Sequence, residues 1–130
     1  MTRHIVEQQE AFDMSKMGAL ESRFADIIWN NEPLASGQLV KMAEQELGWK
    51  PTTSYTVLKR LCERGIFQNQ NSMVTSLISR DEFYAEQSDR FVKETFDGSL
   101  PAFLAAFGAK NRFTDKEVDE LKRLIDGMKE

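Results

Sequence analysis

The sequence predicts a mostly α-helical chain with one small β-hairpin near its middle. Two features of the apolar pattern predict this fold class. From residue 18 to residue 64, apolar residues recur at helical spacing, and from residue 66 to residue 78 they shift to short strand-like runs. Helical spacing returns after residue 79 and continues towards the C-terminus, with many large apolar side chains.

The first helix is expected between Gly18 and about Trp29. Its apolar face is formed by Leu20, Phe24, Ile27 and Ile28, at positions i, i+4, i+7 and i+8. Pro33 marks the end of this helix, because the residue before a proline is driven out of the helical region of backbone conformation.

Two more helices are expected. For the second, Ser36 is the predicted N-cap and Gly48 the stop. Its apolar residues are Leu39, Val40, Met42, Ala43 and Leu47. The third helix is expected from about Pro51 to Arg64, with the proline in the first turn, where a missing N–H costs nothing. Its inward residues are Val57, Leu58, Leu61 and Cys62.

A hairpin is expected next, from strands at residues 66–68 and 73–78 around the polar tip 69–72. Three helices followed by a hairpin make a winged helix-turn-helix, whose reading helix enters the major groove of DNA. The segment Trp49–Gly65, WKPTTSYTVLKRLCERG, has the composition of such a helix, since its first turns carry short hydroxyl residues and its later part an apolar stripe. The sequence therefore predicts a DNA-binding regulator.

The C-terminal part is predicted to be helical. Ser79 with Glu82, and Thr114 with Glu117, match the capping box that begins a helix, and residues 100–107 form a compact apolar segment between them. Such a tail has too many large apolar groups to lie alone in water. Pairing with a second copy buries them by isologous contact, and folding back on the winged helix is the alternative.

The expected organisation is an N-terminal arm (1–17), a winged helix-turn-helix (18–78) and a helical dimerisation region (79–130). The residues expected at the dimer interface are Phe91, Phe96, Leu100, Phe103, Leu104, Phe107, Leu121, Leu124 and Ile125.

The composition excludes several function classes. The formal net charge is −4, and residues 18–70 hold six basic against six acidic residues, which does not suit non-specific coating of nucleic acid. With one cysteine, one histidine and no glycine-rich phosphate loop, we expect no enzyme, no cofactor and no metal site. No apolar run approaches the ~20 residues that span a bilayer, and the N-terminus lacks a secretion signal. We therefore expect no membrane insertion and a cytoplasmic location.

Three features occur in a fixed order from Gly18 to Glu130: the opening LESRFADIIW, the segment WKPTTSYTVLKRLCERG, and the helical tail. With these features the chain resembles the penicillinase repressor family of bacterial transcription regulators. The resemblance implies a winged helix-turn-helix, a C-terminal dimerisation region, and repression by a homodimer bound to a palindromic double-stranded operator. It also implies induction by a sensor-linked protease that cuts in the dimerisation region. Leu100-Pro101 departs from the usual substrates there, so the scissile bond is left unassigned.

The resemblance also assigns the DNA contacts. The residues expected to make them are Ser36, Gln38, Lys50, Thr52, Thr53, Tyr55, Thr56, Lys59 and Arg60. Hydroxyls at positions 52–56 can bond phosphates or base edges, although the first two threonines also suit helix initiation alone. Lys59 and Arg60 cannot both face the groove, so one is expected to contact phosphate. The contacts from positions 36, 38 and 50 would position the protein without reading sequence.

Winged-helix proteins often place a basic residue of the wing against phosphate, but the tip of this wing (68–72) contains no Lys or Arg. A winged-helix protein–protein interaction module is therefore the alternative function, and salt dependence separates the two, since phosphate contacts release counterions. A repressor that encloses a small molecule in its aromatic tail is a further variant.

Overall fold

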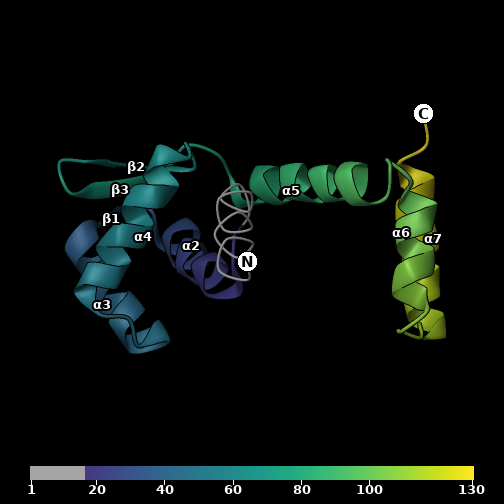
Figure 1. The fold of residues 1–130 in the computed structure, drawn as a ribbon, viewed down its shortest axis with the longest axis horizontal. Helices are drawn as coiled ribbons and strands as arrows, with labels where there is room; N and C mark the ends of the chain where they lie inside the picture. Colours follow the sequence, from purple (N-terminus) through teal and green to yellow (C-terminus); the bar gives the residue numbers. More distant parts are fainter. Residues whose placement is uncertain (1–16) are drawn as a thin grey trace, which may run out of the picture. The chain divides into compact units, whose positions relative to one another are not determined.

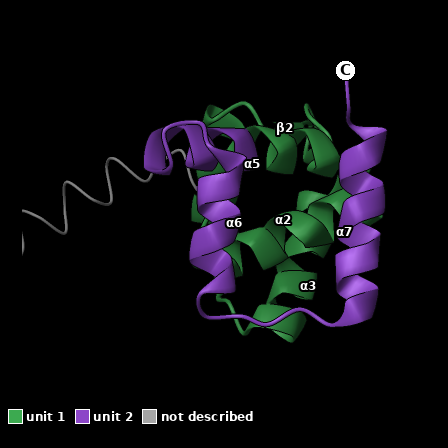
Figure 2. Cartoon of the chain, turned by 90° about the vertical axis from the view of Figure 1, so that its right-hand side faces the viewer, with its two compact units in different colours: residues 1–87 green, residues 88–130 purple. Residues whose placement is uncertain are grey.

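The computed structural model describes residues 17–130. The predicted arm therefore lies outside the described residues, except for Met17, which packs against the core. The chain divides into two compact units, one ending at Gln87 and the other comprising residues 88–130 (Figure 2). The predicted division at residues 78/79 stays a prediction.

Unit 1 has the element order of a winged helix-turn-helix (Figure 1), which confirms the predicted fold class. Its elements are α2 (Ala19–Asn31), β1 (Leu34–Ala35), α3 (Ser36–Leu47), α4 (Pro51–Glu63), β2 (Phe67–Gln70) and β3 (Met73–Ser76). The three strands form one antiparallel sheet in the order β1-β3-β2. The hairpin of β2 and β3 is the wing.

The core of unit 1 is formed where the helices meet the sheet. Its largest fully buried apolar side chains are Phe24, Phe67, Ile28, Leu39, Leu61 and Val74. Both tryptophans are partly buried and pack against this core. The ring of Trp49 stacks on Phe24 with centroids 5.1 Å apart, and Trp29 lies 5.1 Å from the ring of Phe67.

Two helix expectations were wrong in detail. Leu20 is 51% exposed, because it lies in the first turn of α2, whereas Phe24, Ile27 and Ile28 are buried as expected. Ser36 is not an N-cap. It is the first residue of α3, Ala35 occupies the cap position, and no side chain caps the helix.

The sheet also differs from the predicted hairpin. The turn contains only Asn71 and Ser72, both with positive φ (54° and 64°), so β2 extends to Gln70. β3 ends at Ser76, because the N–H groups of Leu77 and Ile78 both donate to the carbonyl of Ile66 and the ladder stops there. The two-residue strand β1 was not predicted, since it is too short to show a strand period.

Helix α5 (Arg80–Thr95) begins in unit 1 and continues into unit 2, which also contains α6 (Leu100–Gly108) and α7 (Asp115–Gly127). Within unit 2, α6 and α7 run antiparallel and are joined by residues 109–114 (Figure 2). The predicted helix starts are confirmed by hydrogen bonds. Ser79 Oγ accepts from Glu82 N at 3.0 Å, and Thr114 and Glu117 form a complete capping box.

Candidate nucleic-acid interface

Helix α4 has one buried and one exposed face. Ser54, Val57, Leu58 and Leu61 point into unit 1 and are between 0% and 7% exposed. The opposite face carries exposed side chains with hydrogen-bonding groups: Thr52, Thr53, Tyr55, Thr56 and Lys59. Because the buried face fixes α4 against the core, the polar face is presented as one rigid surface.

The N-terminus of α4 is also open. Pro51 occupies the first turn, and Lys50 at the N-cap position provides no side-chain cap. The first intrahelical bond described here runs from Ser54 N to Lys50 O at 3.2 Å. The N–H groups of Thr52 and Thr53, which precede it, point out of the helix end together with the positive pole of its dipole. This arrangement suits a phosphate oxygen.

The hydroxyls of α4 are not equivalent. Thr56 Oγ1 donates to the carbonyl of Thr52 at 2.8 Å, so its hydroxyl hydrogen is already used within the helix. Thr56 Oγ1 can still accept a hydrogen bond, and the Thr56 side chain remains exposed. Ser54 lies on the same helix but is fully buried, which excludes it from a reading surface.

The structure separates the two basic residues of α4. Arg60 Nη1 lies 2.9 Å from Glu21 Oε1, so its guanidinium is paired with the first turn of α2. Lys59 is exposed, and no ion pair is found for it or for Lys50 among the described residues. Of the two, Lys59 is therefore the better placed to contact phosphate. The pairing of Arg60 with Glu21 was not predicted, because the two residues are 39 positions apart and no local pattern indicates the contact.

The helix that precedes α4 presents one of its two predicted contact residues. Gln38 is exposed in the first turn of α3. Ser36 is only 6% exposed, and its N–H donates to the carbonyl of Ser72 at 2.8 Å. Ser36 thus connects α3 to the wing turn and offers little surface to a partner.

The wing presents amides rather than charges. Asn69, Gln70, Asn71 and Ser72 are exposed at its tip. Gln68 is partly buried, and its Nε2 donates to Thr75 Oγ1 across the hairpin at 3.1 Å. The exposed tip can form hydrogen bonds with phosphate but adds no Coulomb attraction to it.

The predicted dimerisation residues of unit 2 differ in their surroundings. The four phenylalanines among them form a chain of ring contacts within one chain, which Phe113, not predicted at the interface, extends, with centroids 5.6 to 6.2 Å apart: Phe91, Phe96, Phe103, Phe107 and Phe113. Other apolar side chains are between 39% and 57% exposed: Leu100, Leu104, Leu124 and Ile125. Met128, which was not predicted at the interface, is 74% exposed at the end of α7. Leu121 is partly buried.

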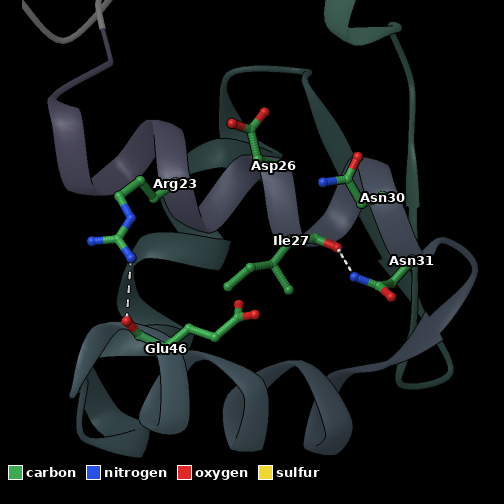
Figure 3. Close-up of a pocket in the computed structure, with 6 residues that line it drawn as sticks. All are labelled: Arg23, Asp26, Ile27, Asn30, Asn31 and Glu46. Carbon is green, nitrogen blue, oxygen red and sulfur yellow. Dashed lines mark hydrogen bonds between the residues drawn. The ribbon is translucent and has the colours of Figure 1, made fainter.

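A shallow pocket lies beside α2 and the end of α3 (Figure 3). It is lined by Arg23, Asp26, Ile27, Asn30, Asn31 and Glu46. Arg23 Nη2 donates to the carbonyl of Glu46 at 3.3 Å, and Asn31 Nδ2 donates to the carbonyl of Ile27 at 2.8 Å. Asp26 of the same pocket pairs with Arg80, so three of its polar side chains are already engaged within the protein.

Other kinds of site find no support in the part of the chain that the structure describes. No group of three or more His, Cys, Asp or Glu side chains is placed to hold a metal ion. No helix among residues 17–130 is long and apolar enough to cross a membrane. Cys62 is half-buried, and burial, followed by the nearby charge of Glu63, raises the pKa of its thiol, which makes it a poor nucleophile.

A comparison with protein families identifies the family to which this chain belongs. The family described as penicillinase repressor matches residues 17–127, which is most of the chain. The chain belongs to the penicillinase repressor family. Members of that family are DNA-binding transcriptional repressors, regulators rather than enzymes, and the exposed face of α4 fits such a role.

Two curated relatives of the penicillinase repressor family are bacterial. The methicillin resistance regulatory protein MecI of Mammaliicoccus sciuri is 19% identical over 115 residues, which cover 85% of this chain and 94% of that protein. The penicillinase repressor of Bacillus licheniformis is 21% identical over 107 residues, covering 79% of this chain and 84% of that protein. The similarity therefore extends across both units.

Proposed function

We propose that this protein represses transcription as a homodimer bound to a palindromic operator, with one α4 helix in each major groove. The observation that carries the proposal is the two-sided helix α4, whose buried face is locked into the core while its hydroxyl-rich face is exposed. Thr52 and Thr53 add two backbone N–H groups at the open helix end. Because the proposed target is DNA, we place the protein in the cytoplasm.

The exposure of unit 2 supports the homodimer. No residue from 88 to 130 is buried in the single chain, although α6 and α7 carry many large apolar side chains. A second copy would cover the same surface on each protomer, and the two reading helices would then face half-sites separated by whole helical turns of DNA, about 10 base pairs each. Loss of the dimer would weaken operator binding, because one molecule would no longer hold both half-sites.

We further propose that proteolysis in the dimerisation region relieves repression, through a protease linked to a sensor. Proteases bind extended backbone. Pro101 restrains the backbone in the first turn of α6, so it disfavours cleavage at that point. The residues that join α6 to α7 (109–114) are largely outside helices. The scissile bond stays unassigned.

Selection of genomic DNA fragments by the purified protein at two salt concentrations tests the proposal. We expect enrichment of a palindrome upstream of an operon, and binding that weakens steeply as salt rises. If no sequence is enriched at either salt concentration, the protein–protein interaction module becomes the better hypothesis.

A paired substitution then tests the reading surface. Thr53→Ala with Thr56→Ala should weaken operator binding by roughly 10-fold, since each of two lost hydrogen bonds is worth about 0.5–1.5 kcal/mol. Thr95→Ala, which removes an exposed hydroxyl at the end of α5, is the control and should bind as the parent does. Parent-like operator binding by the double variant would show that another surface reads the DNA.

A further inference from the structure

The ion pair between Arg60 and Glu21 connects the reading helix to α2. Arg60 Nη1 and Glu21 Oε1 are 2.9 Å apart, and the two side chains are 42% and 24% exposed. Glu21 is the more covered of the two. Its carboxylate therefore depends more on this partner for its hydrogen bonds than it would if it were free in water.

The position of Arg60 on α4 gives this pair a consequence for DNA binding. Thr52, Thr56 and Lys59 lie at i, i+4 and i+7, on one stripe opposite the buried face. Arg60 is one residue further along, so it is turned by about 100° from Lys59 towards the flank of the helix. From this flank a long side chain can reach either α2 or a phosphate at the edge of the groove.

We propose that Glu21 is a positioning residue that holds Arg60 on α2 and keeps it away from the DNA backbone. This inference rests on the proposed DNA-binding function. Its effect is to lower the affinity for DNA of any sequence, so that binding depends on the hydroxyl face of α4. Lys50, at the start of α4, and Lys59, on its outward face, then remain exposed cations for contact with phosphate.

Electrostatics keeps the pair closed when DNA binds. If Arg60 moved to a phosphate, the partly covered carboxylate of Glu21 would lose its partner beside a polyanion. The gain from one phosphate contact would be offset by that unpaired charge. Removing the charge of Glu21 removes the penalty and leaves the guanidinium free to bind phosphate.

The experiment measures affinity for an unrelated duplex and for the selected operator at salt concentrations from 50 to 200 mM. The full-length proteins compared are the parent, Glu21→Gln, Arg60→Gln and the double variant. Glu44→Gln is the matched control, because it makes the same charge change at an exposed position of α3 in the same unit. Thermal unfolding of each variant establishes that it is folded.

We expect Glu21→Gln to bind the unrelated duplex more tightly and to steepen the slope of log affinity against log salt by about 1, which is about four-fold in affinity over that salt range. Arg60→Gln should keep the parental slope, and the double variant should match Arg60→Gln. Glu44→Gln should not steepen the slope.

Two results would overturn the inference. One is a parental slope in folded Glu21→Gln. The other is a slope about 1 shallower in Arg60→Gln, which would mean that Arg60 already contacts phosphate in the parent. The measurement on Arg60→Gln still tests the inference if Glu21→Gln fails to fold. A parent protein that binds no DNA at all would instead overturn the proposed function.

Discussion

Trp29 Nε1 donates a hydrogen bond to the carbonyl of Ile78 at 3.1 Å, which ties α2 to the segment that leads from the wing into α5. The same indole lies 5.8 Å from the ring of Phe83 and 6.1 Å from that of Tyr84, both in the first turns of α5. Arg80 strengthens this junction, since its Nε is 2.9 Å from Asp26 Oδ1 and its guanidinium lies over the ring of Tyr84. The start of α5 is thus packed into unit 1.

Trp29→Phe should destabilise the protein by about 1 to 2 kcal/mol, because it removes the donor to the Ile78 carbonyl and part of the aromatic contact. Denaturant unfolding measures this change. Trp49→Phe is the matched control, since Trp49 is also partly buried and stacks on Phe24, but donates no side-chain hydrogen bond among the described contacts. Equal losses in the two variants would mean that the hydrogen bond contributes nothing to stability.

Ser54→Ala should leave stability unchanged or raise it by up to about 1 kcal/mol. Ser54 Oγ is fully buried and has no hydrogen-bond partner in the described structure, so its hydroxyl is desolvated without compensation. Ser76→Ala is the contrasting variant, because Ser76 Oγ lies 2.8 Å from both carboxylate oxygens of Glu32. Thermal unfolding of both variants measures the difference. We expect Ser76→Ala to be destabilising, and the reverse order would contradict the assignment of partners.

The capping box of α7 should make this helix sensitive to acid. The backbone N–H of Thr114, and then its hydroxyl, hydrogen-bond to Glu117 and hold the pKa of that carboxyl below its ordinary value of 4.5. A depressed pKa means that the stabilisation is complete above pH 4.5 and is lost as pH falls through the lower folded value. NMR titration of Glu117 and amide exchange in α7 measure both effects.

Thr114→Ala is the control for this pH dependence. Without the hydroxyl, the first turn of α7 should exchange faster at neutral pH, and the pKa of Glu117 should move back towards its ordinary value. A Glu117 pKa that is the same in parent and variant would mean that the threonine hydroxyl plays no part in the shift.

Leu124→Asp should weaken self-association at least ten-fold, about 1.4 kcal/mol, because it would place a carboxylate in the proposed interface. Leu124 is 57% exposed in the single chain, so the fold of unit 2 does not depend on burying it. Sedimentation velocity measures the dimer. Lys122→Gln changes the charge by the same amount at an exposed position of α7 and should leave the dimer intact. An undiminished dimer in Leu124→Asp would place the interface elsewhere.

Much of the fold was predictable because its signals are local. The apolar spacing of α2, α3 and α4, the glycine after Leu47 and the capping pairs at Ser79 and Thr114 each act over a few residues. The hairpin was found, but its turn was placed too broadly, because Gln70 is as polar as a turn residue while its backbone pairs with Met73. The strand β1 gave no signal, since it exists only by pairing with β3.

The candidate site was predictable as a segment but not residue by residue. The sequence indicated that residues 52–56 start a reading helix, and the structure exposes four of these five side chains. The inward position of Ser54 follows from its helical spacing to Val57 and Leu58, although as a polar residue it was not counted with the apolar face. The sequence could not indicate that Ser36 is covered, because that depends on the wing turn that the fold brings near it. The distinction between Lys59 and Arg60 likewise needed the position of Glu21.

The sequence by itself determined the order of the first three helices and the hairpin, the winged-helix class and the presence of an apolar C-terminal region, because helical spacing, strand runs and capping motifs are set by residues within a few positions of one another. Only the tertiary structure decided which polar groups are free. The partner of Arg60 is 39 positions earlier in the chain, and the partner of Trp29 is 49 positions later. Such contacts depend on how α2 packs against α4 and the wing, and that packing is a property of the whole core rather than of any local pattern.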